Sequence, residues 1–398
     1  MLTCQDKWGL YVHIPYCRWM CHYCDFAKTA NFDRDKTDGF FRQLTETTQQ
    51  FLRLLERPHV DHFETVYFGG GTPSLFSSEI ESFMSRIGLP SKGQEVTLEA
   101  NPDDVNHRAL ATWKRAGVNR LSIGVQSFDS SGLKFLTRTH SAEAAKDAVR
   151  LCKDYFDNIN VDLIYGWPGQ TLGSWERDLQ TIIDLGIQHV SLYSLTYEGN
   201  TVFAKRHRRQ VITAMPTGDE EELYHTARRV LVGDGFVHEE VSNFAKPHAL
   251  ARHNELYWQG GYYVGIGPGA HGYLPPSQTH PHGVRYGLPR QLRTFTQPIP
   301  HSHNLGELLD SVGAEVEDRG LQEYMLEIIG TGLRTMRGIN IEFLEKYSGL
   351  KFIPNKNVQQ ALDENMCILK SGKFLVLNPD EWFRETAWAV EVSLSFRE

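Results

Sequence analysis

The 398-residue sequence lacks several features that would place it in a special class of protein. It has no apolar run near the roughly 18 residues that a membrane-spanning helix needs, so we expect no integral membrane segment. Its N-terminus lacks the basic start, apolar stretch and small-residue cleavage site of a signal peptide. Positive charge is not in excess, since the formal net charge is −8, whereas a nucleic-acid-binding face is basic. These absences predict a cytoplasmic protein that does not bind nucleic acid.

Cysteine is scarce and unevenly distributed. A cytosolic chain rarely carries disulfides, and this spacing does not resemble a disulfide framework. A metal or cluster site fits the distribution better, because half of the cysteines fall between positions 17 and 24. The cysteines are Cys4, Cys17, Cys21, Cys24, Cys152 and Cys367.

The first half of the chain repeats one unit: a short apolar strand, a polar or Gly-rich loop, and a stretch with helical apolar spacing. Six such units predict an α/β protein with a parallel sheet and right-handed crossovers, either open or closing toward a barrel. The expected strands lie at 10–16, 64–69, 95–100, 120–126, 158–165 and 189–196.

The second half is more varied and suggests two further domains. We expect a helix near 219–232, a strand at 236–244 and an exposed connector at 273–305, where Pro, His, Gln and Gly are frequent. Helical patterns at 321–336 and 340–347 precede a hairpin signal, which suggests a small winged-helix-like domain. The predicted domains are therefore 1–200, 201–305 and 306–398.

The densest chemistry lies in a C-x₃-C-x₂-C run formed by Cys17, Cys21 and Cys24. Three thiolates on one loop can converge on an inorganic cluster, and a four-iron cluster bound by three cysteines leaves one iron open. The alternative is a structural zinc site, which would need a fourth ligand. His22 is the available candidate, although it lies between two of the cysteines.

Further polar or Gly-rich elements follow successive predicted strands. In βα-barrels the functional residues sit at the carboxyl ends of the strands. The sequence places a Gly-Gly-Gly-Thr-Pro run at 69–73, Glu99, Gln126 and Asp162 at such ends. Asp162 lies among apolar neighbours, so it needs a partner, and Arg138 is a candidate partner or ligand clamp.

This constellation resembles the radical S-adenosylmethionine (SAM) superfamily. The cysteine run, with an aromatic residue before its last Cys, looks like the signature of that superfamily, and GGGTP looks like its motif for the amino group of SAM. The resemblance implies a partial (βα)6 barrel, a [4Fe–4S] cluster on Cys17, Cys21 and Cys24, and SAM on the open iron. The cofactor would supply the radical chemistry and the protein would supply placement.

The motifs YVHIPYC, YFGGGTPS, TLEANP, GVNRLSIGVQSF, LTRTH and VDLIYGWPGQT narrow the match. They resemble the oxygen-independent coproporphyrinogen III oxidase-like family, densely over 10–198 and more loosely to the C-terminus. Carried over position by position, the resemblance implies a set of residues around SAM. These are Tyr11, Tyr23, Gly70, Gly71, Thr72, Glu99, Gln126, Arg138 and Asp162.

Two branches of that family are distinguished by local differences. The coproporphyrinogen dehydrogenases carry a further Cys two positions after the third ligand, where this chain has Phe26, and a longer N-terminal extension. The chain better resembles the HemW branch of heme chaperones, with an HN-x-x-YW motif at 253–258. That resemblance implies heme and acceptor hemoproteins as partners, and a homodimer is a further expectation. An electron donor is expected if SAM is cleaved. Whether the protein is an enzyme stays open. The alternative function is oxidative decarboxylation of coproporphyrinogen III.

A neutral imidazole is a natural axial ligand of heme iron, so His253 and His271 are the candidate heme ligands. The structural alternative is that His253 and Asn254 bond to a turn while Tyr257 and Trp258 belong to the core.

Overall fold

The structure, a computed structural model, describes residues 7–57 and 59–397, so Cys4 lies outside the described residues. Its first half forms the predicted parallel sheet, in which β1 to β6 lie side by side in chain order. This confirms the α/β class inferred from the repeated units. The six strands are β1 (Trp8–Ile14), β2 (Thr65–Gly70), β3 (Glu95–Ala100), β4 (Arg120–Gln126), β5 (Asn158–Tyr165) and β6 (His189–Ser194).

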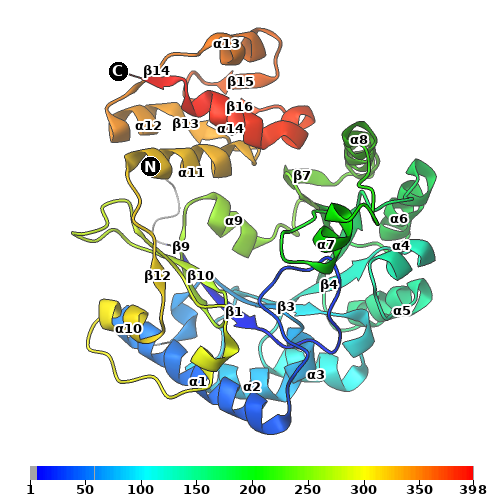
Figure 1. The fold of residues 1–398 in the computed structure, drawn as a ribbon, viewed down its shortest axis with the longest axis vertical. Coiled ribbons are helices and arrows are strands. Elements are labelled where there is room, and N and C mark those ends of the chain that lie inside the picture. The colour runs from blue at the N-terminus through cyan, green and yellow to red at the C-terminus, as the bar shows by residue number, and fades with distance from the viewer. Residues whose placement is uncertain (1–6, 58, 398) are drawn as a thin grey trace.

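Helices connect these strands and cover the outer side of the curved sheet (Figure 1). Each buries one face, as the apolar spacing predicts; the first, for example, buries Phe40, Leu44 and Phe51 against the sheet. Asp33 caps that helix by accepting a hydrogen bond from the backbone N–H of Lys36. The helices are α1 (Arg34–Leu54), α2 (Ser77–Ile87), α3 (His107–Arg115), α4 (Ser130–Phe135), α5 (Ala142–Lys153) and α6 (Leu172–Asp184).

The sheet extends beyond the six predicted strands at both edges. On one side β9 adds a parallel strand next to β1, and antiparallel strands β10, β11 and β12 follow. On the other side β8 and β7 pair antiparallel with β6 and with each other. The added strands are β7 (Val237–Glu240), β8 (Asn243–Ala245), β9 (Tyr262–Ile266), β10 (His271–Leu274), β11 (Val284–Gly287) and β12 (Glu315–Val316).

Two expectations for this region were wrong. The single strand predicted at 236–244 is a hairpin, because the chain reverses at Val241 and Ser242, where the Glu240 carboxylate accepts the Ser242 N–H at 3.2 Å. The segment 273–305 is not simply an exposed connector, because β11 lies within it and Tyr286 is fully buried. Proline and glycine there mark the turns between short strands.

Four further helices, among them α9, accompany the extended sheet. The first backbone N–H groups of α9, at Arg252 and His253, donate to the Glu95 carboxylate at the start of β3. This places α9 at the amino ends of the parallel strands. No helix among the described residues has the length and apolarity needed to cross a membrane. The four are α7 (Val202–Arg208), α8 (Thr217–Gly233), α9 (Arg252–Trp258) and α10 (Leu305–Ser311).

The C-terminal part forms a small α+β unit stacked beyond α9 (Figure 1). Its three-stranded antiparallel sheet has the order β13-β16-β15, and its helices and hairpin follow the winged-helix-like order expected from the sequence. Of the elements after residue 305, α10 packs on α1 and β12 joins the large sheet. Its elements are α11 (Leu321–Leu333), β13 (Ile339–Asn340), α12 (Ile341–Ser348), β14 (Lys351–Phe352), α13 (Lys356–Asp363), β15 (Cys367–Lys370), β16 (Phe374–Leu377), α14 (Glu385–Ser393) and β17 (Phe396–Arg397).

Candidate functional site

The cysteine loop follows β1 at the carboxyl end of the parallel sheet. The loop is fastened at its base, where Cys17 N–H donates to the Thr29 carbonyl at 2.9 Å. Cys17 is buried, whereas Cys21 and Cys24 are half-buried. All three face one cavity of about 510 Å³. The backbone thus brings together the thiols that sequence spacing selected.

The chemistry of this donor set fits a cluster held by three thiolates. Burial raises the pKa of the Cys17 thiol to about 11, so binding iron there would release its proton. In the part of the chain that the structure describes, no group of three or more His, Cys, Asp or Glu side chains converges to hold a single metal ion. A four-iron cluster needs less convergence, because each thiolate bonds a different iron.

The glycine run after β2 forms the wall beside the cysteines. A Cβ added to Gly70, whose φ is +113°, would lie 2.6 Å from Cε1 of His13, and one added to Gly71 would lie 2.7 Å from the Tyr16 carbonyl oxygen. Only glycine fits such close approaches without strain. Gly71 N–H donates to the Ile14 carbonyl at 2.7 Å, which ties this wall to the strand that carries the cysteine loop.

Two carboxylates, one from β3 and one from β5, line the same cavity. Glu99 accepts hydrogen bonds from the Tyr67 hydroxyl at 2.8 Å and from the Gly70 N–H at 3.1 Å. Asp162 accepts from Ser122 at 2.9 Å and Asn160 at 2.7 Å. Burial raises the pKa of Glu99 to about 7 and also raises the pKa of Asp162. A cationic ligand in this cavity would favour the charged form of both groups.

Arg138 reaches the cavity from the segment after α4. Its guanidinium donates to the Asn101 side-chain oxygen at 2.5 Å, to the Gly124 carbonyl at 2.8 Å and to the Cys21 sulfur at 3.5 Å. The Nε atom of Arg138 is buried with no hydrogen-bond partner among the described residues. A buried polar atom without a partner is costly, so this group is suited to a bound anion. Arg138 is therefore not the direct partner of Asp162 that the sequence allowed.

The structure brings together almost all of the residues inferred for SAM. Those that line the cysteine cavity are Tyr23, Gly70, Gly71, Thr72, Glu99, Gln126, Arg138 and Asp162. Tyr11 lies outside it, because its hydroxyl is bonded to Nδ1 of His13 at 3.0 Å inside the barrel. Sequence reasoning missed Tyr67, Ser122 and Tyr193, which also line the cavity. The alternation of side-chain direction along each strand could have predicted them, since every second residue faces the barrel interior.

The two candidate heme ligands lie on different elements, α9 and β10, and in different surroundings. His253 is buried, with Nδ1 2.7 Å from the Thr65 hydroxyl and Nε2 2.7 Å from the Tyr257 hydroxyl. Burial lowers its pKa to about 3, so it is neutral. His271 is exposed at the start of β10 and lines neither large cavity, and its side chain forms no hydrogen bond within the described residues. Both ring nitrogens of His253 are thus already used.

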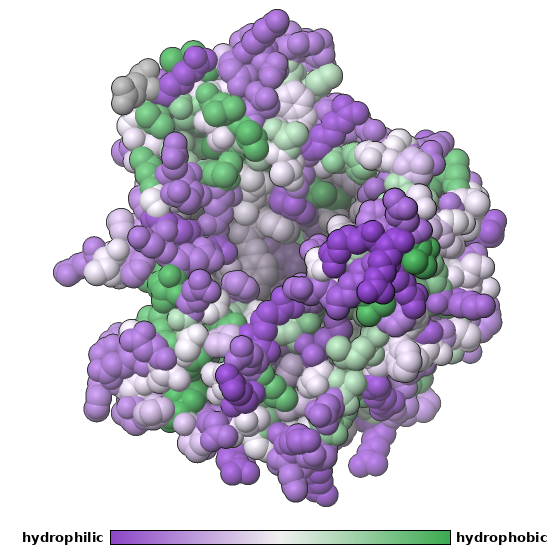
Figure 2. All heavy atoms as spheres, in the orientation of Figure 1, coloured by the Kyte–Doolittle hydropathy of each residue, from purple (hydrophilic) through white to green (hydrophobic). Residues whose placement is uncertain are grey.

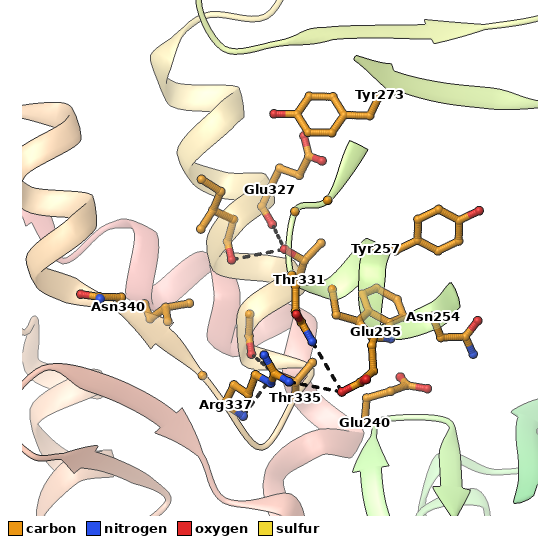
Figure 3. A pocket seen from close by; sticks show the side chains of 18 of the residues that line it. Glu240, Asn254, Glu255, Tyr257, Tyr273, Glu327, Thr331, Thr335, Arg337 and Asn340 are labelled. Carbon is orange, nitrogen blue, oxygen red and sulfur yellow. Dashed lines mark hydrogen bonds and ion pairs between the residues drawn. The ribbon is translucent and has the colours of Figure 1, made fainter. Parts of the chain in front are cut away.

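A second and larger cavity, of about 1200 Å³, lies between α9 and the C-terminal unit. Figure 2 shows the recess that opens between these two parts of the molecule. In Figure 3, Tyr257 of α9 lies on one side, and Glu327 and Thr331 of α11 lie on the other. Tyr257 and Trp258 of the HN-x-x-YW motif therefore line a cavity at the amino ends of the strands, opposite to the cysteines.

Polar groups in this second cavity are only partly matched. Arg285 and Arg319 both pair with the Glu327 carboxylate. The indole Nε1 of Trp258 and one carboxylate oxygen of Glu239 are buried without a hydrogen-bond partner in the described part of the chain. Aromatic side chains form much of the wall, among them Tyr263, Tyr273, Tyr324 and Phe343. The cavity therefore suits a large aromatic ligand that carries polar groups.

Comparisons with known proteins agree with this arrangement. The family model described as "Radical SAM superfamily" matches residues 11–182. The chain is 34% identical over 346 residues to the heme chaperone HemW of Lactococcus lactis, spanning 86% of this chain and 85% of that protein. It is 43% identical over 381 residues to the mitochondrial radical S-adenosyl methionine domain-containing protein 1 of Bos taurus, spanning 92% and 83%. The solved structure of coproporphyrinogen III oxidase HemN from Escherichia coli superposes with a TM-score of 0.76 over 97% of this chain and 90% of that chain. At 18% identity, this last likeness shows the fold alone.

Proposed function

Because the chain belongs to the radical SAM superfamily and, within it, to the family of HemW heme chaperones, we propose that it binds heme and delivers it to acceptor hemoproteins. As a member of that superfamily, it binds a [4Fe–4S] cluster and SAM. We infer that Cys17, Cys21 and Cys24 hold three of the irons. The supporting observation is that these three thiols line one cavity.

The residues of the cysteine cavity match the functional groups of SAM. When bound at these cysteines, the cluster would be able to supply one electron for reduction of the sulfonium. Around it, the Gly70 and Gly71 backbone lets the ligand approach closely, and Thr72 adds a hydroxyl. The Glu99 and Asp162 carboxylates suit the positive and hydroxyl groups of the ligand, and Arg138 suits its carboxylate. Burial of these groups excludes water and strengthens their interaction with a bound ligand.

One observation carries the heme proposal: the cavity lined by Tyr257 and Trp258 is separate from the cysteine cavity. Its volume of about 1200 Å³ exceeds the roughly 300–1,000 Å³ that is usual for small-molecule sites, so it offers room for a tetrapyrrole. Aromatic walls pack against the macrocycle. Arg285 and Arg319, which both pair with Glu327, are cationic groups that can bind the heme propionates.

Heme titration of two matched aromatic variants tests this proposal. Trp258→Ala removes a wall of the larger cavity, whereas Phe26→Ala removes a side chain that is 63% exposed at the cysteine cavity. We expect a Soret band in the wild-type protein and a heme affinity about thirtyfold weaker in Trp258→Ala, since a buried aromatic anchor is worth about 2 kcal/mol or more. Phe26→Ala should bind as the wild type does. The reverse pattern would move heme to the cysteine cavity, and the absence of both a Soret band and heme transfer to an apo-acceptor would refute the chaperone function.

The alternative function is oxidative decarboxylation of coproporphyrinogen III, the substrate in the name of the HemN protein whose fold this chain shares. Anaerobic incubation with SAM, a reductant and coproporphyrinogen III tests it. Formation of protoporphyrinogen would show an enzyme, and its absence in a preparation that binds heme supports the chaperone. Metal analysis of the same preparation tests the cluster, because zinc without iron or sulfide would point to a structural zinc site. Sedimentation with and without the cofactors tests the expected homodimer.

A further inference from the structure

The helix α7 and the residue after it form an isolated basic surface. Lys205, Arg206, His207, Arg208 and Arg209 follow one another and are all exposed. None of them forms an ion pair with an Asp or Glu of the described residues. The chain as a whole has a net charge of −8. Figure 2 shows this surface as a strongly hydrophilic patch over α7.

The basic surface is attached directly to the cysteine loop. The backbone N–H of Phe203 in α7 donates to the His22 carbonyl at 3.1 Å. The buried Phe203 ring lies 6.0 Å from the ring of His22 and 6.5 Å from that of Tyr23. His22 and Tyr23 are the residues between Cys21 and Cys24. A protein docked on α7 would therefore rest against the part of the loop that holds two of the three cluster thiolates.

We propose that α7 is the docking surface for an acidic one-electron carrier protein that reduces the cluster, an inference that rests on the proposed cluster site. The step balances without any bond change: the carrier loses one electron and the cluster gains it. Electron transfer weakens steeply with distance, so docking against the cysteine loop is favourable. Complementary charge raises the rate of encounter. Val202 and Val211, which are 40% and 70% exposed beside the basic run, supply the apolar contact of a small interface.

The size and isolation of the patch favour a redox partner over a nucleic acid. Redox encounters use small interfaces, below about 1,200 Å², which one short helix and its flanking residues can provide. Nucleic-acid-binding domains are basic overall, with a pI above about 9, whereas this chain is acidic, with a net charge of −8. We therefore expect the rate of cluster reduction to depend on this basic surface.

A matched pair of charge-reversal variants separates this role from a general charge effect. The test variant is Lys205→Glu/Arg206→Glu/Arg209→Glu, which spares Arg208 because its guanidinium holds the Gly199 carbonyl. The control variant reverses the same number of charges at exposed positions elsewhere that make no ion pair in the described structure. It is Lys92→Glu/Lys356→Glu/Lys370→Glu.

The assay follows cluster bleaching anaerobically after mixing the reconstituted full-length protein with reduced flavodoxin, an acidic flavin carrier, or with dithionite. At low salt we expect the test variant to be reduced by flavodoxin at least tenfold more slowly than the wild type. The difference should shrink as salt is raised. Dithionite should reduce all three proteins equally, and the control variant should react with flavodoxin within about threefold of the wild type.

Several results would overturn the proposal. They are an unchanged flavodoxin rate in the test variant, an equal loss in the control variant, or a wild-type cluster that dithionite reduces and flavodoxin does not. Loss of heparin binding with an unchanged flavodoxin rate would assign the patch to polyanions instead. Failure of the proposed cluster site is distinguishable, because the wild-type protein would then contain no iron and sulfide and would show no bleaching with either reductant.

Discussion

Replacing His253 by alanine should lower the stability of the protein, because His253 has a structural role and is not a heme ligand. The imidazole makes two buried hydrogen bonds, to Thr65 and Tyr257, and stacks on the Tyr67 ring with centroids 5.0 Å apart. Each partner left unsatisfied costs about 1–3 kcal/mol, and the missing ring leaves a cavity with a further cost. We therefore expect His253→Ala to lower the free energy of unfolding by about 3–5 kcal/mol.

Equilibrium urea unfolding measures this loss, and His271 provides the control. His271→Ala removes an exposed side chain without a hydrogen bond in the described structure, so its effect should stay within about 0.5 kcal/mol. Heme titration under native conditions completes the experiment. If His253→Ala kept wild-type stability but lost its Soret band, the structural role would be refuted and His253 would be the axial ligand. If His271→Ala lost the band, the exposed histidine would be the ligand.

The remaining predictions concern the cysteine cavity and the pH dependence of folding. Gly70→Ala should abolish SAM binding, measured by calorimetry, and cost about 2 kcal/mol or more of stability, because it combines positive φ with a clash against His13. Its control is Gly39→Ala, where an added Cβ meets nothing within 4 Å; helix propensity predicts a gain of about 0.5–1 kcal/mol there. Burial raises the pKa of Asp178 from 3.8 to about 6. Protonated Asp178 therefore stabilises the folded protein. This contribution is fully present below the pKa of the unfolded chain and is lost as pH rises through the pKa of the folded protein. The free energy of unfolding of Asp178→Asn relative to the wild type should therefore change by about 2.4 kcal/mol between pH 4 and pH 7. A difference that stays constant over this range would contradict the raised pKa.

Local patterns were sufficient for the strands that carry the site. Around Glu99, Gln126 and Asp162, apolar residues alternate with polar ones or form a short run that ends at a polar residue. The strands β3, β4 and β5 begin and end close to the predicted positions. The Gly-Gly-Gly run was identifiable because positive φ and close approach demand glycine. These signals lie within a few residues of one another, so sequence alone could place them.

The features that sequence did not predict depend on contacts between distant segments. The larger cavity is lined by residues from 237 to 374, and no local pattern records that α9 and α11 face each other. His253 was read as a heme-ligand candidate, whereas Thr65, almost two hundred positions away, accounts for one of its hydrogen bonds. The strand β9 was missed because its pairing with β1 joins segments that lie more than two hundred residues apart.

That last pairing has a consequence for how the protein is made. β1 precedes the cysteine loop and is held on one side by β2 and on the other by β9. During synthesis, β1 therefore keeps an open edge until the chain has been extended past Ile266. Such long-range strand pairing forms slowly, and an open edge invites pairing with other chains. A fragment that stops after β6 would contain every cysteine of the loop and still expose this edge of β1.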